Sequence, residues 1–109
     1  MADTLKILAQ SAPAANALTD IYTVPAVTSA VVSSVIVCNQ SGVATTFRFA
    51  LAIAGAADEP KQYLYYNLPL PANDTFIATV GVTLATTDVV RVFSPSGSTS
   101  WTLVGVEIT

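Results

Sequence analysis

Apolar and polar residues alternate in short runs along this chain, and turn-forming residues separate the runs. Alternation with a period of two is typical of a β-strand with one buried face, whereas no long window shows the spacing of an amphipathic helix. The pattern predicts strands over residues 4–10, 18–25, 29–39, 44–54, 61–68, 75–82, 88–94 and 101–108. Short strands at roughly ten-residue spacing favour an all-β fold, a single antiparallel β-sandwich or jelly roll of about 7–8 strands.

Two of these runs make specific predictions about which side chains face the core. Residues 29–39 carry apolar side chains on both faces, with Val31, Val35 and Val37 expected on the same face, and this predicts a central strand or an interface strand. Residues 44–54 alternate more clearly. Their inward face is expected to consist of Phe47, Phe49, Leu51 and Ile53.

The N-terminal segment, residues 1–17, has a different pattern. Leu5 and Ile7 alternate as they would in a strand, but the Ala, Pro and Asn residues that follow resemble a tether more than a tight hairpin. We therefore expect an extended N-terminal strand or arm over residues 1–17 and a single sandwich domain over residues 18–109. The arm would pair either with a neighbouring subunit or with its own sheet, and the sequence favours neither.

The composition changes this picture by raising the question of what covers the surface. The 109 residues are 52% hydrophobic and only 10% charged, whereas an average soluble domain is about 25% charged. Much of the surface must then consist of Ala, Ser, Thr and Val. Because large exposed apolar patches are rare on monomers, the composition predicts a subunit of an oligomer or lattice.

The charge distribution argues against two classes of partner. The net charge is −3, and the four Lys and Arg residues are scattered singly. No basic stripe is present that would neutralise nucleic-acid phosphates or bind an acidic membrane. No uninterrupted apolar run is long enough for a membrane-spanning helix, and the start MADTLKILAQ lacks the basic region of an export signal.

The sequence gives little support to catalysis or metal binding. The chain has no His, which excludes Ser-His-Asp and Cys-His sites. Asp74 and Asp88 each stand between a turn and a strand, where Asp ordinarily bonds local backbone amides, so we predict turn formers rather than a catalytic pair. A calcium site built from Asp58, Glu59, Asn73, Asp74 and Asp88 is the alternative, but the dense acids of calcium loops are missing. We predict no catalytic residue, metal or cofactor.

The remaining candidate residues are contacts for a partner. Four aromatic residues have two possible roles: they lie at the core edge or in a subunit contact, or they form a platform for a sugar. They are Tyr63, Tyr65, Tyr66 and Trp101. The period of two places Tyr63 and Tyr65 on one face. Cys38, the single cysteine, is predicted to be a small buried hydrophobe. The candidate partner contacts are Leu5, Ile7, Leu8, Tyr63, Tyr65, Tyr66 and Trp101.

Residues 18–109 also carry a series of local motifs: a Tyr-Thr-Val-Pro entry, a Cys-Asn turn, a Leu-Tyr-Tyr strand, an Asn-Asp-Thr turn and an Asp-Val-Val-Arg-Val strand. In this series the chain resembles small structural proteins of tailed bacteriophages. The resemblance implies a component of the virion, assembled in the cytoplasm of a host bacterium. It implies as partners the major capsid protein, copies of the chain itself, or alternatively tail proteins or a host surface glycan.

Three functions therefore remain open. The leading hypothesis is a non-enzymatic capsid decoration (cement) protein that stabilises the assembled head through contacts between subunits. The alternative is a tail or fibre component, with a carbohydrate-binding face for host attachment. A free carbohydrate-binding module is the third. The low charge favours the assembled functions, and the clustered Tyr residues favour the sugar-binding ones.

Overall fold

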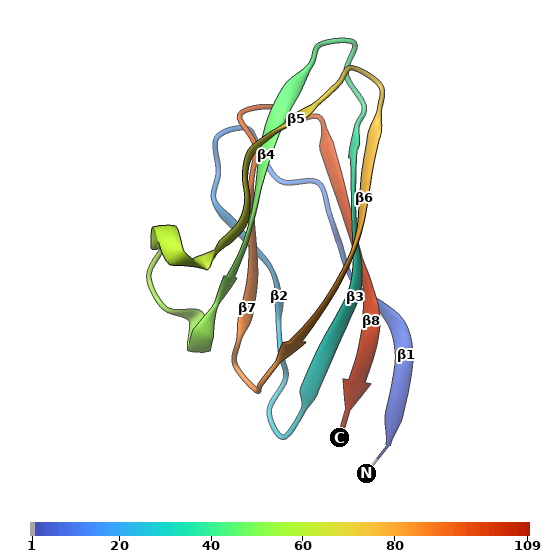
Figure 1. Cartoon of the computed structure of the whole chain (residues 1–109), viewed down its shortest axis with the longest axis vertical. Helices are drawn as coiled ribbons and strands as arrows, with labels where there is room; N and C mark the ends of the chain where they lie inside the picture. Colours follow the sequence, from blue (N-terminus) through green and yellow to red (C-terminus); the bar gives the residue numbers. More distant parts are fainter. Residues whose placement is uncertain (1) are drawn as a thin grey trace.

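Eight strands form two antiparallel four-stranded sheets in the computed structural model, which describes residues 2–109 (Figure 1). The strands are β1 (Asp3–Ser11), β2 (Thr19–Thr23), β3 (Ser29–Asn39), β4 (Thr45–Ala52), β5 (Tyr63–Leu70), β6 (Thr75–Leu84), β7 (Val89–Phe93) and β8 (Thr99–Ile108). Sheet I has the order β1-β8-β3-β6, and sheet II has the order β2-β7-β4-β5. The expected all-β, antiparallel fold is confirmed.

The two sheets enclose a core that is centred on aromatic rings. Trp101 on sheet I is 1% exposed and lies against Phe47 and Phe49 of sheet II, with ring centroids 5.6 Å and 6.5 Å away. Valines from both sheets fill the space around these rings. The fully buried ones are Val32, Val35, Val37, Val90 and Val92. Alternating side chains of one face of each sheet thus bury together, as in other β-sandwiches.

Helical structure is limited to single turns. Within residues 2–109 the structure contains two 3₁₀ turns, η1 (Ile53–Gly55) and η2 (Pro60–Gln62), both in the connection from β4 to β5. The β-branched composition explains this result, because Val, Ile and Thr suit strands and are restricted in helices. None of the residues that the structure describes belongs to a helix with the length and apolar character needed to cross a membrane.

β3 is a central strand, as expected, but the set of its residues that point into the core differs from the prediction. It lies between β8 and β6, and Val32, Val35 and Val37 point into the core, whereas Val31 points outward. An irregularity between Val32 and Ser34 inserts a residue and shifts the alternation. Opposite this bulge stands Gly105, where a Cβ atom would clash with the carbonyl oxygen of Val31. The period of two holds on either side of the bulge and fails across it.

β4 also departs from its predicted pattern at one end. Phe47 and Phe49 are buried as expected, but Ile53 lies outside the strand and is 79% exposed. The strand ends at Ala52 because the chain turns at Ala54, whose φ is +52°. A strand cannot continue through this left-handed conformation, so Ile53 loses its inward direction.

Residues 3–11 form an edge strand of sheet I, and the expected extended arm is not confirmed. β1 pairs with β8 from Asp3 opposite Ile108 to Ser11 opposite Trp101. The two ends of the chain lie together (Figure 1), where Ala2 and Thr109 exchange two backbone hydrogen bonds of 2.9 Å. The following loop is also attached, since the Asn16 amide donates to the Ser94 carbonyl oxygen at 2.9 Å.

Candidate functional site

The outer face of sheet I carries aliphatic side chains on each of its four strands, interspersed with Ser and Thr. The register places Leu5, Val106 and Val31 in one row across three strands, and Ile7 beside Val104 in the next. Ile36 and Ile77 form a third pair, towards the other edge. Leu5, Ile7 and Ile77 are 80%, 53% and 65% exposed. The face therefore presents aliphatic side chains to the surroundings where a polar face would be the ordinary arrangement.

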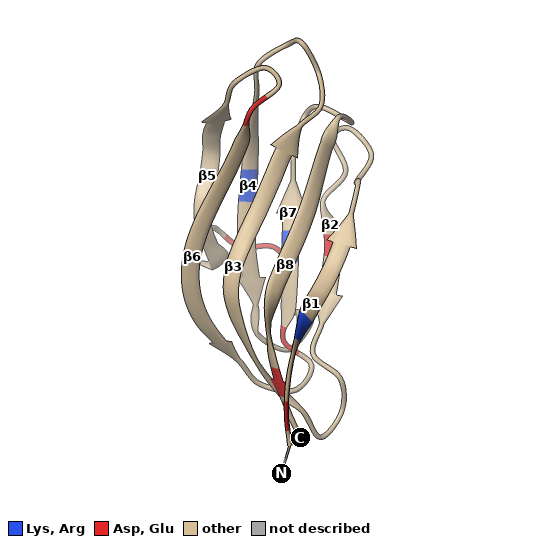
Figure 2. Ribbon diagram, turned by 90° about the vertical axis from the view of Figure 1, so that its right-hand side faces the viewer, with Lys and Arg blue, Asp and Glu red and all other residues tan. Residues whose placement is uncertain are grey.

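Within the strands of sheet I, the charged residues lie at the end near the termini. Figure 2 shows this face: β3 is uncoloured, the coloured positions on β1 and β8 lie towards the termini, and the turn that enters β6 at the opposite end is red. Among the four strands the charged residues are Asp3, Lys6 and Glu107. Lys6 Nζ lies 2.8 Å from Glu107 Oε1. Glu107 pairs with the buried Ala30, and Lys6 pairs with the buried Gly105, so this ion pair lies on the inner side of the sheet edge. Asp3, which alternates with Leu5, is the charged residue of the four strands on the outer face.

Glu107 is held by two donors at that end of the sandwich. Its second oxygen accepts a hydrogen bond of 2.6 Å from the Tyr22 hydroxyl. The bonds from Lys6 and Tyr22 lower the pKa of the Glu107 carboxyl. Burial, together with the bond to Glu107, raises the pKa of the Tyr22 phenol. This group ties β2 to β8 and so joins the two sheets.

Cys38 belongs to the outer face of sheet I, which corrects the expectation of a buried cysteine. It is half-buried, and its neighbours across the sheet are Ser100 and Thr75. The strand keeps its alternation after the bulge, so Val37 and Asn39 point inward and Cys38 points outward. The single thiol of the chain is thus a natural probe of whatever covers this face.

The outer face of sheet II carries charge and is partly covered by the β4–β5 connection. Ala50, Ala52 and Val89 on this face are each less than 5% exposed because residues 53–62 lie over them. Arg91 is fixed beneath this cover. Its Nε donates to Asp20 Oδ1 at 2.6 Å, and its Nη1 donates to the Ala56 carbonyl oxygen at 2.9 Å.

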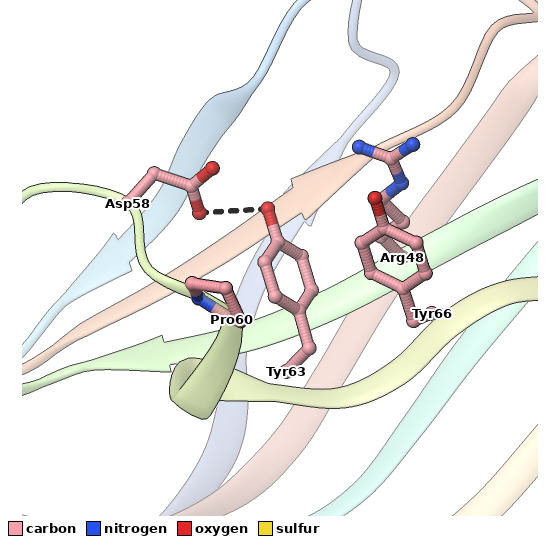
Figure 3. Close-up of a pocket in the computed structure, with 5 residues that line it drawn as sticks. All are labelled: Arg48, Asp58, Pro60, Tyr63 and Tyr66. Carbon is pink, nitrogen blue, oxygen red and sulfur yellow. Dashed lines mark hydrogen bonds between the residues drawn. The ribbon is translucent and has the colours of Figure 1, made fainter.

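Beside that cover lies a pocket of about 360 Å³, shown in Figure 3. Arg48 comes from β4, Tyr63 and Tyr66 from β5, and Asp58 and Pro60 from the connection between these strands. Figure 3 shows the Tyr63 phenol pointing to Asp58, and the Arg48 guanidinium above the Tyr66 ring. The volume is near the lower end of the range for small-ligand sites.

Arg48 is held on three sides within this pocket. Its guanidinium carbon lies 4.2 Å from the centroid of the Tyr66 ring and 4.6 Å from that of Phe93. Its Nε donates to Asn67 Oδ1 at 2.8 Å. The ion pairs among residues 2–109 involve Lys6, Lys61 and Arg91, so Arg48 is the basic side chain of the described chain that has no carboxylate partner.

Tyr63 and Asp58 form the other wall. The Tyr63 hydroxyl donates to Asp58 Oδ1 at 2.7 Å, and its ring meets the Tyr66 ring edge to face, with centroids 5.1 Å apart. Burial, followed by the bond to Asp58, raises the pKa of the Tyr63 phenol, while the nearby Arg48 guanidinium opposes the rise. The phenol therefore stays protonated and keeps donating to Asp58 at neutral pH.

The prediction that Tyr63 and Tyr65 share a strand face is wrong. Phe49 pairs with Tyr65, and its neighbour Ala50 pairs with Tyr63, so β5 has one extra residue, Leu64, at this point. The bulge turns Tyr65 towards the core, where its ring contacts Phe47 and Phe49. A local shift of this kind leaves no clear signal in the alternation of the sequence.

The other candidate partner contacts separate into surface and core. Leu5 and Ile7 lie on the outer face of sheet I, and Leu8 packs against the core at a bulge in β1. Trp101 lies at the centre of the core and is not a surface residue, so the prediction that it contacts a partner is corrected. The alternatives for the aromatic residues were a core position or subunit contact and a sugar platform. Trp101 lies in the core, because it points to the same side of β8 as the buried Leu103.

Asp74 and Asp88 behave as turn residues, as predicted. Asp74 Oδ1 accepts from the amide of Thr75 at 2.8 Å. Asp88 accepts from the amides of Ala85 and Ala54, each at 2.9 Å, and so fixes both its own turn and the left-handed turn after β4. Within residues 2–109 no three side chains of the His, Cys, Asp and Glu types gather as metal ligands.

Sequence reasoning missed Arg48 as a site residue, although one signal was present. Its position between Phe47 and Phe49 predicts that it points away from the core. What it would meet there depends on the β5 bulge and on the course of residues 53–62, and neither follows from the local pattern.

Comparison of the sequence with protein families and curated proteins found no match. The resemblance to bacteriophage structural proteins therefore stays a prediction, and the site must be interpreted from its own geometry.

Proposed function

We propose that this protein is a non-enzymatic structural subunit of a bacteriophage virion, a decoration protein that binds the outside of the capsid and stabilises the assembled head. The observation that carries the proposal is the outer face of sheet I, where aliphatic side chains alternate with Ser and Thr and the one charged strand residue is Asp3 near the N-terminus. A face of this kind suits a dry contact with another protein, because interface cores are depleted in charged residues. Its partner would be the major capsid protein or a further copy of the chain.

The size of the face supports this use. Four strands about 4.8 Å apart and about 25–30 Å long present a flat area of about 500 Å². Ser and Thr side chains share this area with the aliphatic ones, so its apolar part is smaller than the whole face. The whole face is more than half of the roughly 800 Å² that each partner buries in a standard interface.

The strand order is compatible with this function. In the orders β1-β8-β3-β6 and β2-β7-β4-β5, successive strands change sheet except between β4 and β5, and this is the arrangement expected of a jelly roll. Jelly rolls are found in viral capsid domains, and also in lectins and cupins, so the fold alone does not select the function. We propose the jelly roll as the finer description of this sandwich.

Decoration requires no chemistry beyond binding. A subunit that binds the assembled shell but not its free components stabilises the shell by mass action. Many copies on symmetry-related sites would add the effects of their separate contacts. β1 would contribute strongly, because its Leu5 and Ile7 are both more than half exposed.

The proposal is tested with heads of the bacteriophage whose genome carries the gene, prepared without this protein. We expect the wild-type chain to sediment with the heads and to raise the temperature at which they release DNA. The double variant Leu5→Lys/Ile77→Lys should do neither, whereas Leu64→Lys, a control on the other sheet, should act as wild type. A gene found outside any phage or prophage genome, or equal binding by the double variant, would contradict the proposal.

A second candidate is a tail or fibre component that contacts a host glycan. The pocket formed by Arg48, Asp58, Pro60, Tyr63 and Tyr66 favours it, because decoration alone gives no reason for such a pocket. Locating the protein in an image of the virion separates the two candidates.

A further inference from the structure

We infer that the pocket on the outer face of sheet II is a binding site for a neutral saccharide. The inference concerns the chemistry of this pocket and does not depend on a role in assembly, since the pocket and the face of sheet I belong to different sheets. It would stand if the outer face of sheet I proved to have no partner.

The first argument is the combination of donor and acceptor. Arg48 uses its Nε on Asn67, so the two Nη groups of its fork are the part that faces a ligand. Asp58 uses Oδ1 to accept from Tyr63, and its second oxygen remains as an acceptor. A sugar hydroxyl both donates and accepts, so neighbouring hydroxyls can bind Asp58 and Arg48 at the same time.

The second argument is the net charge of the pocket. Arg48 contributes one positive charge and Asp58 one negative charge, and its other lining residues are Pro60, Tyr63 and Tyr66. An anionic ligand would gain from Arg48 and lose from Asp58, and a cation would meet the reverse. A ligand rich in hydroxyls and without charge uses both groups with no such penalty.

The third argument is apolar surface at the same place. Tyr66 is 58% exposed, and Tyr63 stands across it at an interplanar angle of 88°. Arg48 covers one face of the Tyr66 ring. The exposed remainder of that ring, together with Pro60, offers apolar surface for the C–H groups of a sugar ring, beside the polar groups that bind its hydroxyls. Specific small-ligand sites combine these features: mostly apolar walls with a few convergent polar groups.

The fourth argument is that the polar groups are fixed before any ligand arrives. The Arg48 guanidinium lies between the Tyr66 and Phe93 rings, and Tyr63 is bonded to Asp58. Groups that are already ordered lose less conformational entropy on binding. The rival explanation is that the cluster only attaches β5 and residues 53–62 to the sheet, and the experiment must distinguish the two.

The test begins with the labelled wild-type chain on a printed array of neutral and acidic bacterial glycans, followed by calorimetry with each glycan that binds. We expect binding to neutral glycans. In ¹⁵N-labelled protein the best ligand should shift the amide signals of Arg48, Asp58, Tyr63 and Tyr66 and leave those of β3 and β6 unchanged.

Four variants then assign the binding to the pocket. Arg48→Gln, Asp58→Asn and Tyr66→Ala should each weaken binding by roughly tenfold or more, the effect of losing a bond to a charged group or a stacking surface. Lys61→Gln is the matched control, because it removes one positive charge from a side chain that is 81% exposed in the same connection. It should leave the affinity unchanged. Melting temperatures near that of wild type establish that each variant is folded, and Asp58→Asn preserves the shape if Arg48→Gln does not fold.

Three results would overturn the inference. These are an array on which no glycan binds, binding restricted to carboxylated or other anionic glycans, and binding that the three pocket variants retain. If no glycan binds, the cluster has only the structural role of attaching β5. Binding restricted to anionic glycans would show an anion site at Arg48. Binding that the three variants retain would show that the saccharide site lies elsewhere.

Discussion

The two outer faces of the sandwich have opposite chemistry. On sheet I the outward positions are mostly aliphatic or hydroxyl-bearing, and the charged residues within its strands lie towards the termini (Figure 2). On sheet II the outward positions include Arg48 and Arg91, and residues 53–62 cover part of the surface. The low charge of this chain is therefore not an average property of its surface. Charged side chains are scarce on the outer face of sheet I in particular, and this is the face that we propose binds the partner.

Removal of β1 should have the largest effect on stability, because β1 forms one edge of sheet I and carries Leu5 and Ile7 of its outer face. Deleting residues 1–12 should lower the free energy of unfolding by about 5 kcal/mol or more, since several backbone bonds at about 0.5–1.5 kcal/mol each and the packing of Leu8 and Ala9 are lost. Thermal melting measures the effect. A truncated chain that keeps its melting temperature but no longer binds its partner would show instead that β1 serves as an exchanged arm.

A pair of aromatic substitutions compares the core with the outer face of sheet II. Trp101→Ala should cost about 3–5 kcal/mol, because it empties the centre of the core. Tyr66→Ala should cost about 1 kcal/mol or less, because it mainly removes a cation–π contact at the surface. Chemical denaturation of both variants checks the difference. Equal costs would mean that the Tyr66 cluster is part of the folded framework.

The two turn carboxylates should differ in a predictable way. Asp88→Ala should cost about 0.5–2 kcal/mol, the range for a lost bond between a side chain and the backbone at such positions. Asp74→Ala should cost less, because Asp88 accepts from two amides and Asp74 from one. Denaturation curves give the order, and the reverse order would show that the contact between Asp88 and Ala54 does not hold the cover over sheet II.

The charged end of sheet I should make stability depend on pH. The folded pKa of Glu107 is lowered from its ordinary value of 4.5, so its contribution is present above that pH and is lost as the pH falls below it. The folded pKa of Tyr22 is raised from 10.0, so its contribution is present below that pH and is lost as the pH rises above it. The difference in melting temperature between wild type and Glu107→Gln should shrink below pH 4.5. A difference that stays constant with pH would show that ionised Glu107 and its bond from Tyr22 do not contribute to stability.

The smallest effect on folding is expected from charges placed on the apolar face itself. Leu5→Lys and Ile77→Lys should each change the free energy of unfolding by less than about 0.5 kcal/mol, because both side chains are mostly exposed. The same substitutions should weaken binding to the partner. Stability and binding measured on one preparation test this separation, and a large loss of stability would mean that these residues serve the fold.

Much of the fold follows from the sequence, and the reasons for the exceptions are local. Residues 29–39 were expected as a central strand and form β3 with the same bounds, because an apolar pattern on both faces reports burial in a sheet. The outward direction of Val31 and the separation of Tyr63 from Tyr65 were not predicted, since each depends on a bulge. One inserted residue reverses the faces of everything beyond it.

The candidate sites were harder to predict than the strands. The low charge indicated an interface, but its location required the register that places Leu5, Val106 and Val31 in one row. The pocket depends on residues from two strands and a connection, so no single stretch of sequence carries its signal. Tyr63 and Tyr66 were named from their clustering, whereas Arg48 needed the structure.

Cys38 allows the most direct test of the proposed docking face. It is the single cysteine of the chain, and it lies half-buried on the outer face of sheet I. The measurement is the rate at which a maleimide labels it in the free chain and in the head-bound chain, with Leu64→Cys in a Cys38→Ser background as the control on sheet II. We predict that labelling of Cys38 slows at least about tenfold on binding, while the control rate is unchanged. Equal labelling of Cys38 in both states would contradict the claim that this face is the one that docks.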